Sequence, residues 1–159
     1  MLLAIDGGNT QTVLGLLEGQ DVIEHWRVAT DARRTADEFM AVLRGLLTDG
    51  IDDRITGIAI CSTVPAVLHE MREMVARYFA SVHTVLVEPG VRTGVPVLMD
   101  NPREVGTDRI VNSLAAKHLY GGPCIVVDFG TATTFDVVSA AGEYLGGAIA
   151  PGIGVSLDA

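Results

Sequence analysis

One short pattern occurs twice in the chain and restricts the folds that the sequence can adopt. Residues 3–10 read Leu-Ala-Ile-Asp-Gly-Gly-Asn-Thr, and residues 125–132 read Ile-Val-Val-Asp-Phe-Gly-Thr-Ala. Each copy has the pattern of an apolar strand, a turn containing Asp and Gly, and the start of a second strand. Asp6 and Asp128 lie 122 positions apart, which is the length of an ordinary domain. The repeat therefore predicts duplicated domains that each begin with a β-hairpin carrying a carboxylate near its tip.

The residues between the two copies predict strands that alternate with helices. Glu38 follows Thr35 by three positions, which is a capping box at the start of a helix. The order βββαβαβ predicts an α/β fold with a partly parallel sheet. The expected elements are two strands within 2–17, a strand at 21–29, a helix after Thr35 that buries Phe39, Val42, Leu43, Leu46 and Leu47, a strand at 55–61, a helix from Pro65, a strand at 82–87 and a long helix ending near Tyr120.

The run Gly121-Gly122-Pro123 ends the long helix and predicts the domain boundary. The first domain is expected at residues 1–120. Residues 121–159 are expected to hold only the opening strands of a second, incomplete domain, at 124–127, 133–138 and 143–149. These strands are apolar and would leave one face and their edges exposed, so we expect the chain to be a fragment that dimerises or aggregates on its own.

Composition excludes several classes of partner. The chain has 20 acidic and 11 basic residues and a net charge of −9, which argues against binding to nucleic-acid backbone or an anionic membrane. The apolar segment before Asp6 is too short for a signal peptide, and no run is long enough to span a membrane. Cys61 and Cys124 lie in apolar runs, which favours small buried residues over a disulfide. We therefore expect a cytoplasmic protein.

The two predicted hairpin tips suit the binding of phosphate. Glycine lets the backbone approach an anion, and the side chains of Asn9, Thr10 and Thr131 can donate hydrogen bonds to phosphate oxygens. A nearby carboxylate can hold a cation that contacts the phosphates. Two such tips facing across a cleft would bind a nucleoside triphosphate. The alternative, two ordinary tight turns, is disfavoured by the recurrence. The chain contains neither a P-loop nor a dinucleotide-binding Gly-rich motif.

A second group of candidate residues lies near the start of the predicted long helix. Asn101 as the cap and Pro102 in the first position are ordinary helix-start residues. The following residues 106–109 read Gly-Thr-Asp-Arg, which helix-start chemistry does not explain. Asp108 could accept a proton from a substrate hydroxyl, and Arg109 could bind a substrate carboxylate. The alternative is a surface ion pair between the two side chains.

Four segments in the same order resemble the type III pantothenate kinase family. They are residues 5–10, 100–109, 128–133 and 146–152, and the resemblance covers essentially the whole chain. It implies an actin-like ATPase (ribonuclease H-like) fold with duplicated domains and ATP between them. It implies phosphorylation of pantothenate, the first step of coenzyme A synthesis, by a homodimer that uses ATP, Mg²⁺ and a monovalent cation, K⁺ or NH₄⁺.

The resemblance also implies roles for individual residues. Asp108 corresponds to the catalytic base, Asp128 to the K⁺ ligand, and Asp6 to a carboxylate near Mg²⁺, directly or through water. The remaining residues fall into a phosphate-binding group, Asp6, Gly7, Gly8, Asn9, Thr10, Gln11, Thr12, Val13, Gly130 and Thr131, and a pantothenate-binding group, Met99, Gly106, Thr107, Asp108 and Arg109.

The sequence departs from the family pattern at three of these positions and in its length. Gly7 stands where Val is usual, which predicts a looser turn, and Met99 stands where a Tyr that contacts pantothenate is common. Thr107 in place of Ala is a minor change, and the largest departure is that the family's second domain continues beyond the segments present here. Two other functions remain open on the sequence: a kinase of the wider superfamily acting on a sugar or another small acid, and a related non-catalytic regulator or dimerisation module.

Overall fold

The computed structural model describes residues 1–47, 52–88 and 91–158. It divides into two compact units, Met1–Val87 and Glu88–Ala159. The sequence instead suggested a division after Tyr120. The helix α3 (Thr107–Tyr120) falls in the second unit because it packs against β6 and β7 of that unit.

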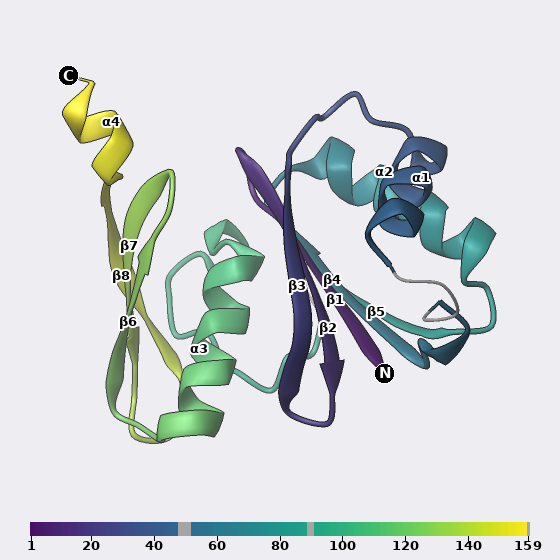
Figure 1. The fold of residues 1–159 in the computed structure, drawn as a ribbon. Helices are drawn as coiled ribbons and strands as arrows, with labels where there is room; N and C mark the ends of the chain where they lie inside the picture. Colours follow the sequence, from purple (N-terminus) through teal and green to yellow (C-terminus); the bar gives the residue numbers. More distant parts are fainter. Residues whose placement is uncertain (48–51, 89–90, 159) are drawn as a thin grey trace. The chain divides into compact units, whose positions relative to one another are not determined.

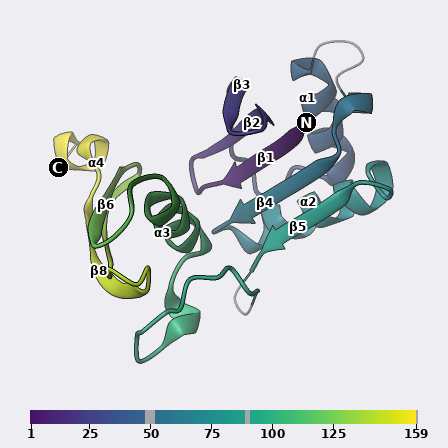
Figure 2. The same ribbon diagram turned by 90° about the horizontal axis from the view of Figure 1, so that it is seen from below.

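The first unit is built on a five-stranded sheet in the residues described, with the order β3-β2-β1-β4-β5. β1 pairs antiparallel with β2 and parallel with β4, and β4 pairs parallel with β5. Figure 2 shows the arrows of β1, β4 and β5 pointing the same way. The mixed sheet confirms the α/β interpretation. The strands are β1 (Leu2–Gly7), β2 (Gln11–Glu18), β3 (Asp21–Ala29), β4 (Gly57–Ser62) and β5 (His83–Val87), and the helices are α1 (Ala36–Leu46), the short η1 (Asp52–Arg54) and α2 (Pro65–Tyr78).

The two long helices of this unit lie on one face of the sheet (Figure 1). The predicted capping box is present, because the Thr35 side chain accepts from the Glu38 N–H and Glu38 accepts from the Thr35 N–H. Val42 was expected to be buried but is half-buried, and Met40, which was not among the expected core residues, is buried. The core consists of Leu3, Ile5, Leu14, Leu16, Phe39, Met40, Leu43, Leu47, Ile55, Ile58, Ile60, Val67, Met71, Met74, Val75 and Phe79. Alternate strand residues therefore face the helices, as half-buried strands require.

The second unit contains a three-stranded antiparallel sheet, in the described residues, of order β6-β7-β8. Its strands are β6 (Cys124–Phe129), β7 (Ala132–Val138) and β8 (Tyr144–Pro151), and α3 packs on β6 and β7. A short η2 (Pro102–Glu104) precedes α3, and a short α4 (Ile153–Leu157) follows β8. The three strands confirm the sequence prediction to within a few residues.

The start of α3 differs from the sequence prediction. Asn101 and Pro102 belong to η2, and the Asn101 amide donates to Glu104 Oε1 at 2.6 Å. Val105 is buried with extended backbone and separates the two helices. α3 begins at Thr107 with Gly106 as its N-cap residue. Gly106 therefore lies before the helix, where glycine costs little, and not inside it.

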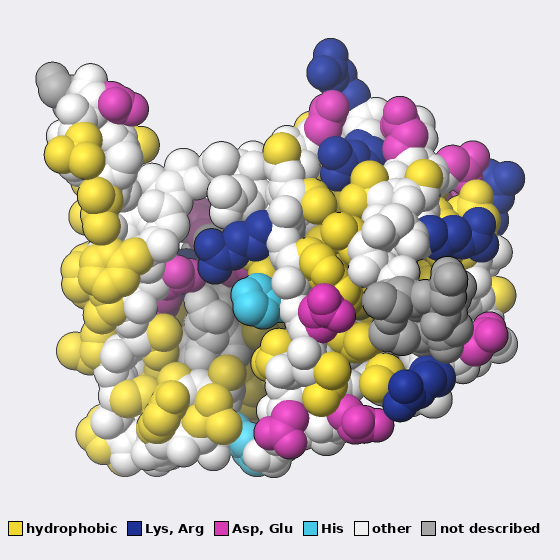
Figure 3. Space-filling model, in the orientation of Figure 1, with side chains coloured by type: hydrophobic (Ala, Val, Ile, Leu, Met, Phe, Trp, Pro, Cys, Tyr) yellow, Lys and Arg dark blue, Asp and Glu magenta, His cyan; other side chains and the backbone are white. Residues whose placement is uncertain are grey.

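The face of the β6–β8 sheet away from α3 is apolar and exposed. Ile125 is 64% exposed and Phe129 is 70% exposed. Val127, Phe135 and Val137 lie on the same face by register and are also exposed. Figure 3 shows hydrophobic side chains gathered over this part of the second unit.

Candidate nucleotide and substrate site

Hydrogen bonds to Thr30, the residue that follows β3, hold the β1–β2 turn in place. Thr12 is fully buried, and its hydroxyl lies 2.9 Å from the Thr30 hydroxyl. Thr30 Oγ1 donates to the Gly8 carbonyl at 2.8 Å, and the Thr30 N–H donates to the Thr10 carbonyl at 3.0 Å. These bonds hold the turn against Thr30, and Asn9 and Thr10 are exposed on it.

The strand end before this turn is closely packed. Gly7 is buried, and a Cβ added to it would lie 2.7 Å from Ser62 Oγ. Ser62 Oγ donates to the Gly7 carbonyl at 2.7 Å. Glycine thus leaves the room that Ser62 occupies against β1, and the looser turn expected at this position stays a prediction. Asp6 is exposed and accepts a bond from the Cys61 thiol at 3.3 Å.

The β6–β7 turn of the second unit presents its own carboxylate. Asp128 is exposed, and its Oδ2 accepts a hydrogen bond from the Asn112 side chain of α3 at 3.2 Å. The Gly130 N–H donates to the Ala132 carbonyl, and the Thr131 carbonyl accepts from the N–H of Gly152. The backbone of this turn is therefore closed, and the Asp128 carboxylate is oriented by α3.

The first turn of α3 holds two unpartnered buried oxygens. Asp108 Oδ1 and Thr107 Oγ1 are buried and have no hydrogen-bond partner among the residues described. A Cβ added to Gly106 would lie only 2.5 Å from Asp108 Oδ1, so the backbone approaches this carboxylate closely. A buried polar atom without a partner is costly and is most easily explained by a ligand or water that completes it.

Asn112 lies four residues after Asp108 on α3, so the two side chains share a helix face. The bond from Asn112 to Asp128 therefore places the predicted cation ligand beside the face that carries the predicted base.

Arg109 does not form the surface ion pair with Asp108 that was one interpretation of the sequence. Its Nε donates to Oδ1 of Asp136 at 2.6 Å, and Asp136 is fully buried. The Tyr144 hydroxyl donates to the same oxygen at 2.8 Å. Burial and this hydrogen bond raise the pKa of Tyr144 to about 12. The tyrosine therefore stays protonated at physiological pH and remains a donor.

Met99 lies within the same unit as the predicted substrate segment. The neighbouring Leu98 N–H donates to the Tyr144 carbonyl, and Met99 Sδ is 4.0 Å from a Cβ added to Gly146. The Met99 side chain thus lies beside β8 and is partly exposed, and its contact with a substrate stays a prediction.

The donor set can be compared with the cations that the resemblance implies. In the ranges 1–47, 52–88 and 91–158, no group of three or more His, Cys, Asp or Glu side chains could hold a metal ion. Each turn carries one exposed carboxylate, Asp6 or Asp128. A single carboxylate suits a Mg²⁺ ion that keeps several waters and binds substrate phosphates. The oxygen donors of these turns are of the type that such hard cations prefer.

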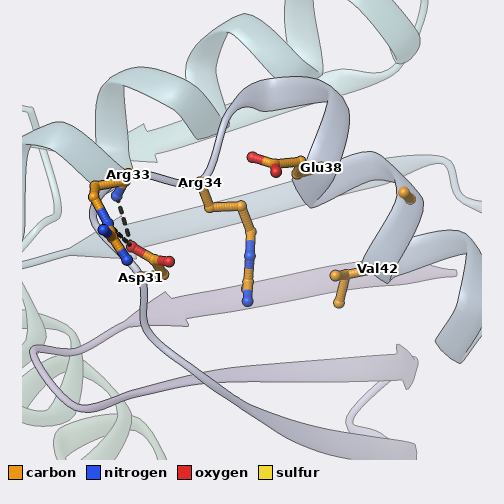
Figure 4. A pocket seen from close by; sticks show the side chains of 6 residues that line it. Asp31, Arg33, Arg34, Glu38 and Val42 are labelled. Carbon is orange, nitrogen blue, oxygen red and sulfur yellow. Dashed lines mark hydrogen bonds and ion pairs between the residues drawn. The ribbon is translucent and has the colours of Figure 1, made fainter.

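A separate pocket of about 630 Å³ lies at the start of α1. Figure 4 shows Asp31, Arg33, Arg34, Glu38 and Val42 around it. Asp31 pairs with Arg33 at 3.3 Å, and Arg34 lies over the Phe39 ring. None of the residues predicted to bind nucleotide or substrate lines this pocket in the part of the chain described.

Sequence reasoning missed three residues of the site: Asn112, Asp136 and Tyr144. Asn112 could have been found from its four-residue spacing to Asp108. Asp136 gave no such signal, because Phe135 and Val137 on either side of it suggested the opposite face of β7 as the buried one.

The fold of the chain matches solved structures at low sequence identity. A candidate N-acetylglucosamine kinase of Porphyromonas gingivalis is 12% identical with a TM-score of 0.53, covering 93% of this chain and 47% of that one. The activator of 2-hydroxyisocaproyl-CoA dehydratase of Clostridium difficile, solved with bound ADPNP, is 10% identical with a TM-score of 0.51, covering 94% and 45%. The fold is that of the actin-like ATPases and sugar kinases.

The sequence identifies the branch within that fold. The profile of the type III pantothenate kinase family matches residues 2–159, and the chain belongs to this family. The type III pantothenate kinase of Streptomyces avermitilis is 66% identical over all of this chain and 62% of its own length. That of Nocardioides sp. is 67% identical over 99% of this chain and 61% of its own length. The chain thus spans about 62% of the length of the curated relatives that it matches. No helix in the described residues is long and apolar enough to cross a membrane.

Proposed function

We propose that this protein transfers the γ-phosphoryl group of ATP to the primary hydroxyl of pantothenate. Family membership supports the reaction class. The observation that carries the proposal is Asp108, whose buried Oδ1 has no partner among the described residues and lies at the start of α3. A carboxylate held in this way is available to accept the proton of a substrate hydroxyl.

The other residues would bind and orient the two substrates. The backbone N–H groups and side chains of the β1–β2 turn, with Asn9 and Thr10 exposed, donate to ATP phosphate oxygens. Thr131 on the β6–β7 turn does the same. Arg109 binds the pantothenate carboxylate, and Met99 contacts the substrate beside β8. Phosphoryl transfer depends mainly on such positioning and on charge neutralisation.

Two cations fit the carboxylates of these turns. Asp6 would hold Mg²⁺, directly or through water, and Asp128 would hold K⁺ or NH₄⁺. When bound, they supply positive charge to the phosphates, which matters in a chain of net charge −9. Asn112 would keep the Asp128 carboxylate oriented for this purpose, because it already donates to one of its oxygens.

The proposal extends to assembly and location. The exposed apolar face of the β6–β8 sheet supports a homodimer, because a large exposed apolar patch is typical of an interaction surface. A cytoplasmic enzyme of coenzyme A synthesis accords with the acidic composition and the absence of a membrane-spanning helix in the described residues.

A coupled kinase assay on the whole protein tests this function. ATP turnover should require pantothenate, and a panel of sugars and other small hydroxy acids should not replace it. Turnover with a sugar in place of pantothenate would reassign the acceptor, and no turnover with any acceptor would favour a non-catalytic regulator.

A further inference from the structure

Asp136 is a buried carboxylate at the centre of a network within the second unit. It is fully buried, and its Oδ1 accepts hydrogen bonds from Arg109 Nε at 2.6 Å and the Tyr144 hydroxyl at 2.8 Å. Its Oδ2 accepts a longer bond from Thr134 Oγ1 at 3.4 Å. Because each carboxylate oxygen has a partner and a guanidinium balances the charge, the cost of burying Asp136 is offset.

The same contacts fix the guanidinium of Arg109. Nε is bound to Asp136, Nη2 lies 3.4 Å from the Phe135 carbonyl, and the guanidinium lies over the Tyr144 ring at 5.8 Å. Nη1 forms no hydrogen bond with any residue that the structure describes. The Arg109 side chain is 14% exposed. The guanidinium is thus held through Nε and Nη2, and its free edge, at Nη1, can still donate hydrogen bonds to a ligand.

Gly147 on β8 leaves room for this arrangement. A Cβ added there would collide with Arg109 Nη2, the Phe135 carbonyl and Asp136. Any side chain at this position would therefore disturb the Arg109–Asp136 pair, and glycine permits β8 to approach it.

We infer that Asp136, together with Tyr144, is a positioning residue that holds Arg109 so that its free edge meets the carboxylate of the substrate. The inference rests on the proposed function. Asp108 and Arg109 are successive residues of α3 and point in different directions. A substrate with a hydroxyl at one end and a carboxylate at the other can engage both, whereas a flexible arginine would lose much of this selectivity.

The test compares two variants with a matched control in the whole protein. Asp136→Asn removes the charge that holds Arg109, and Tyr144→Phe removes one hydrogen bond to Asp136 while keeping the ring. Glu143→Gln is the control, because it makes the same acid-to-amide change where Glu143 accepts from Ser139. Initial rates are measured with pantothenate and with pantothenol, in which the carboxylate is replaced by an uncharged alcohol.

We expect the KM for pantothenate to rise about tenfold or more in Asp136→Asn and about threefold in Tyr144→Phe, since charge-assisted bonds are the stronger ones. The KM for ATP and that for pantothenol should change little, and Glu143→Gln should resemble the wild type. Equal losses for ATP, pantothenate and pantothenol would show a merely structural role and overturn the inference. If Asp136→Asn does not fold, Tyr144→Phe decides the question, by the change in its KM for pantothenate compared with the change in its KM for pantothenol.

A readout without catalysis separates this inference from the proposed function. The Arg109 Nε–H signal in ¹⁵N NMR should be protected from solvent exchange in the wild type and exposed in Asp136→Asn or, to a lesser extent, in Tyr144→Phe. Lack of pantothenate turnover in the wild type would refute the proposed function alone. An Nε–H that exchanges freely in the wild type would refute the positioning role whatever the substrate.

Discussion

A methyl group at position 106 would test whether the exact placement of Asp108 controls turnover. A Cβ on Gly106 lies 2.5 Å from Asp108 Oδ1, where 3.4–4 Å is ordinary contact. The Asp108 carboxylate must therefore move by about 1 Å, and a displacement of this size can reduce a rate by ~10²-fold. We expect Gly106→Ala to lower kcat by about this factor.

The same substitution should leave the fold largely intact. Gly106 has φ −57° and ψ 140°, which is an allowed region for alanine. Losing glycine as the N-cap residue of α3 should cost about 1 kcal/mol, a small part of the ~5–15 kcal/mol that stabilises ordinary domains. The loss of turnover should therefore greatly exceed any loss of folded protein, as measured by urea unfolding.

Gly45→Ala is the matched control for this change. Gly45 lies within α1, and a Cβ added to it meets no described atom within 4 Å. Because alanine is the better helix former, this variant should gain ~0.5–1 kcal/mol in unfolding free energy and keep wild-type turnover.

A double variant shows whether Gly106→Ala acts through Asp108. In an Asp108→Asn background the alanine should cause little further loss, because the group that it displaces no longer accepts a proton. A single Gly106→Ala variant with kcat within about threefold of the wild type would refute the reasoning, as would additive losses in the double variant.

Three further results are expected. Asp108→Asn should lower turnover by ~10²-fold or more while calorimetry still detects pantothenate binding; near-normal turnover would remove Asp108 as the base. Asp128→Ala should raise the KM for ATP and abolish activation by K⁺, whereas a wild type indifferent to K⁺, NH₄⁺ or Na⁺ would contradict the cation assignment. Tyr144 has a pKa of about 12 in the folded chain, above its ordinary value of 10, so the unfolded chain loses this proton first. Its contribution, on the order of 3 kcal/mol at most, is complete below pH ~10 and lost as pH rises toward 12. Urea midpoints measured across this range should fall less steeply in Tyr144→Phe, and parallel slopes would contradict the raised pKa.

Local signals predicted much of the first unit. β3 was expected at Asp21–Ala29 and is observed there, and the Thr35–Glu38 capping box starts α1. Such features depend on residues within one or two turns of each other, so the sequence carries them directly. The start of α3 was wrong because Asn101 and Pro102 are equally good at the start of a short η2.

The site was only partly predictable for a related reason. Asp6, Asp108 and Asp128 stand in recognisable local patterns, and the structure gives each a defined setting. Asp136 is instead buried because Arg109, 27 positions earlier, and Tyr144 on the next strand supply its partners. Long-range pairing of this kind leaves no periodic trace in a single sequence.

The packing of Gly7 also restricts which sequences can share this hairpin. Ser62 and Val67 occupy the space that a side chain at position 7 would need, with Ser62 Cβ 3.0 Å and Val67 Cγ1 3.2 Å from an added Cβ. A chain with valine at position 7 must therefore carry a smaller residue at 62 or 67, or shift β4 against β1. A variant that takes only Leu2–Gly7 from a relative with valine at position 7 should fold poorly. A variant that takes Gly57–Ser62 from the same relative as well should fold, because the residues of the two paired strands must change together.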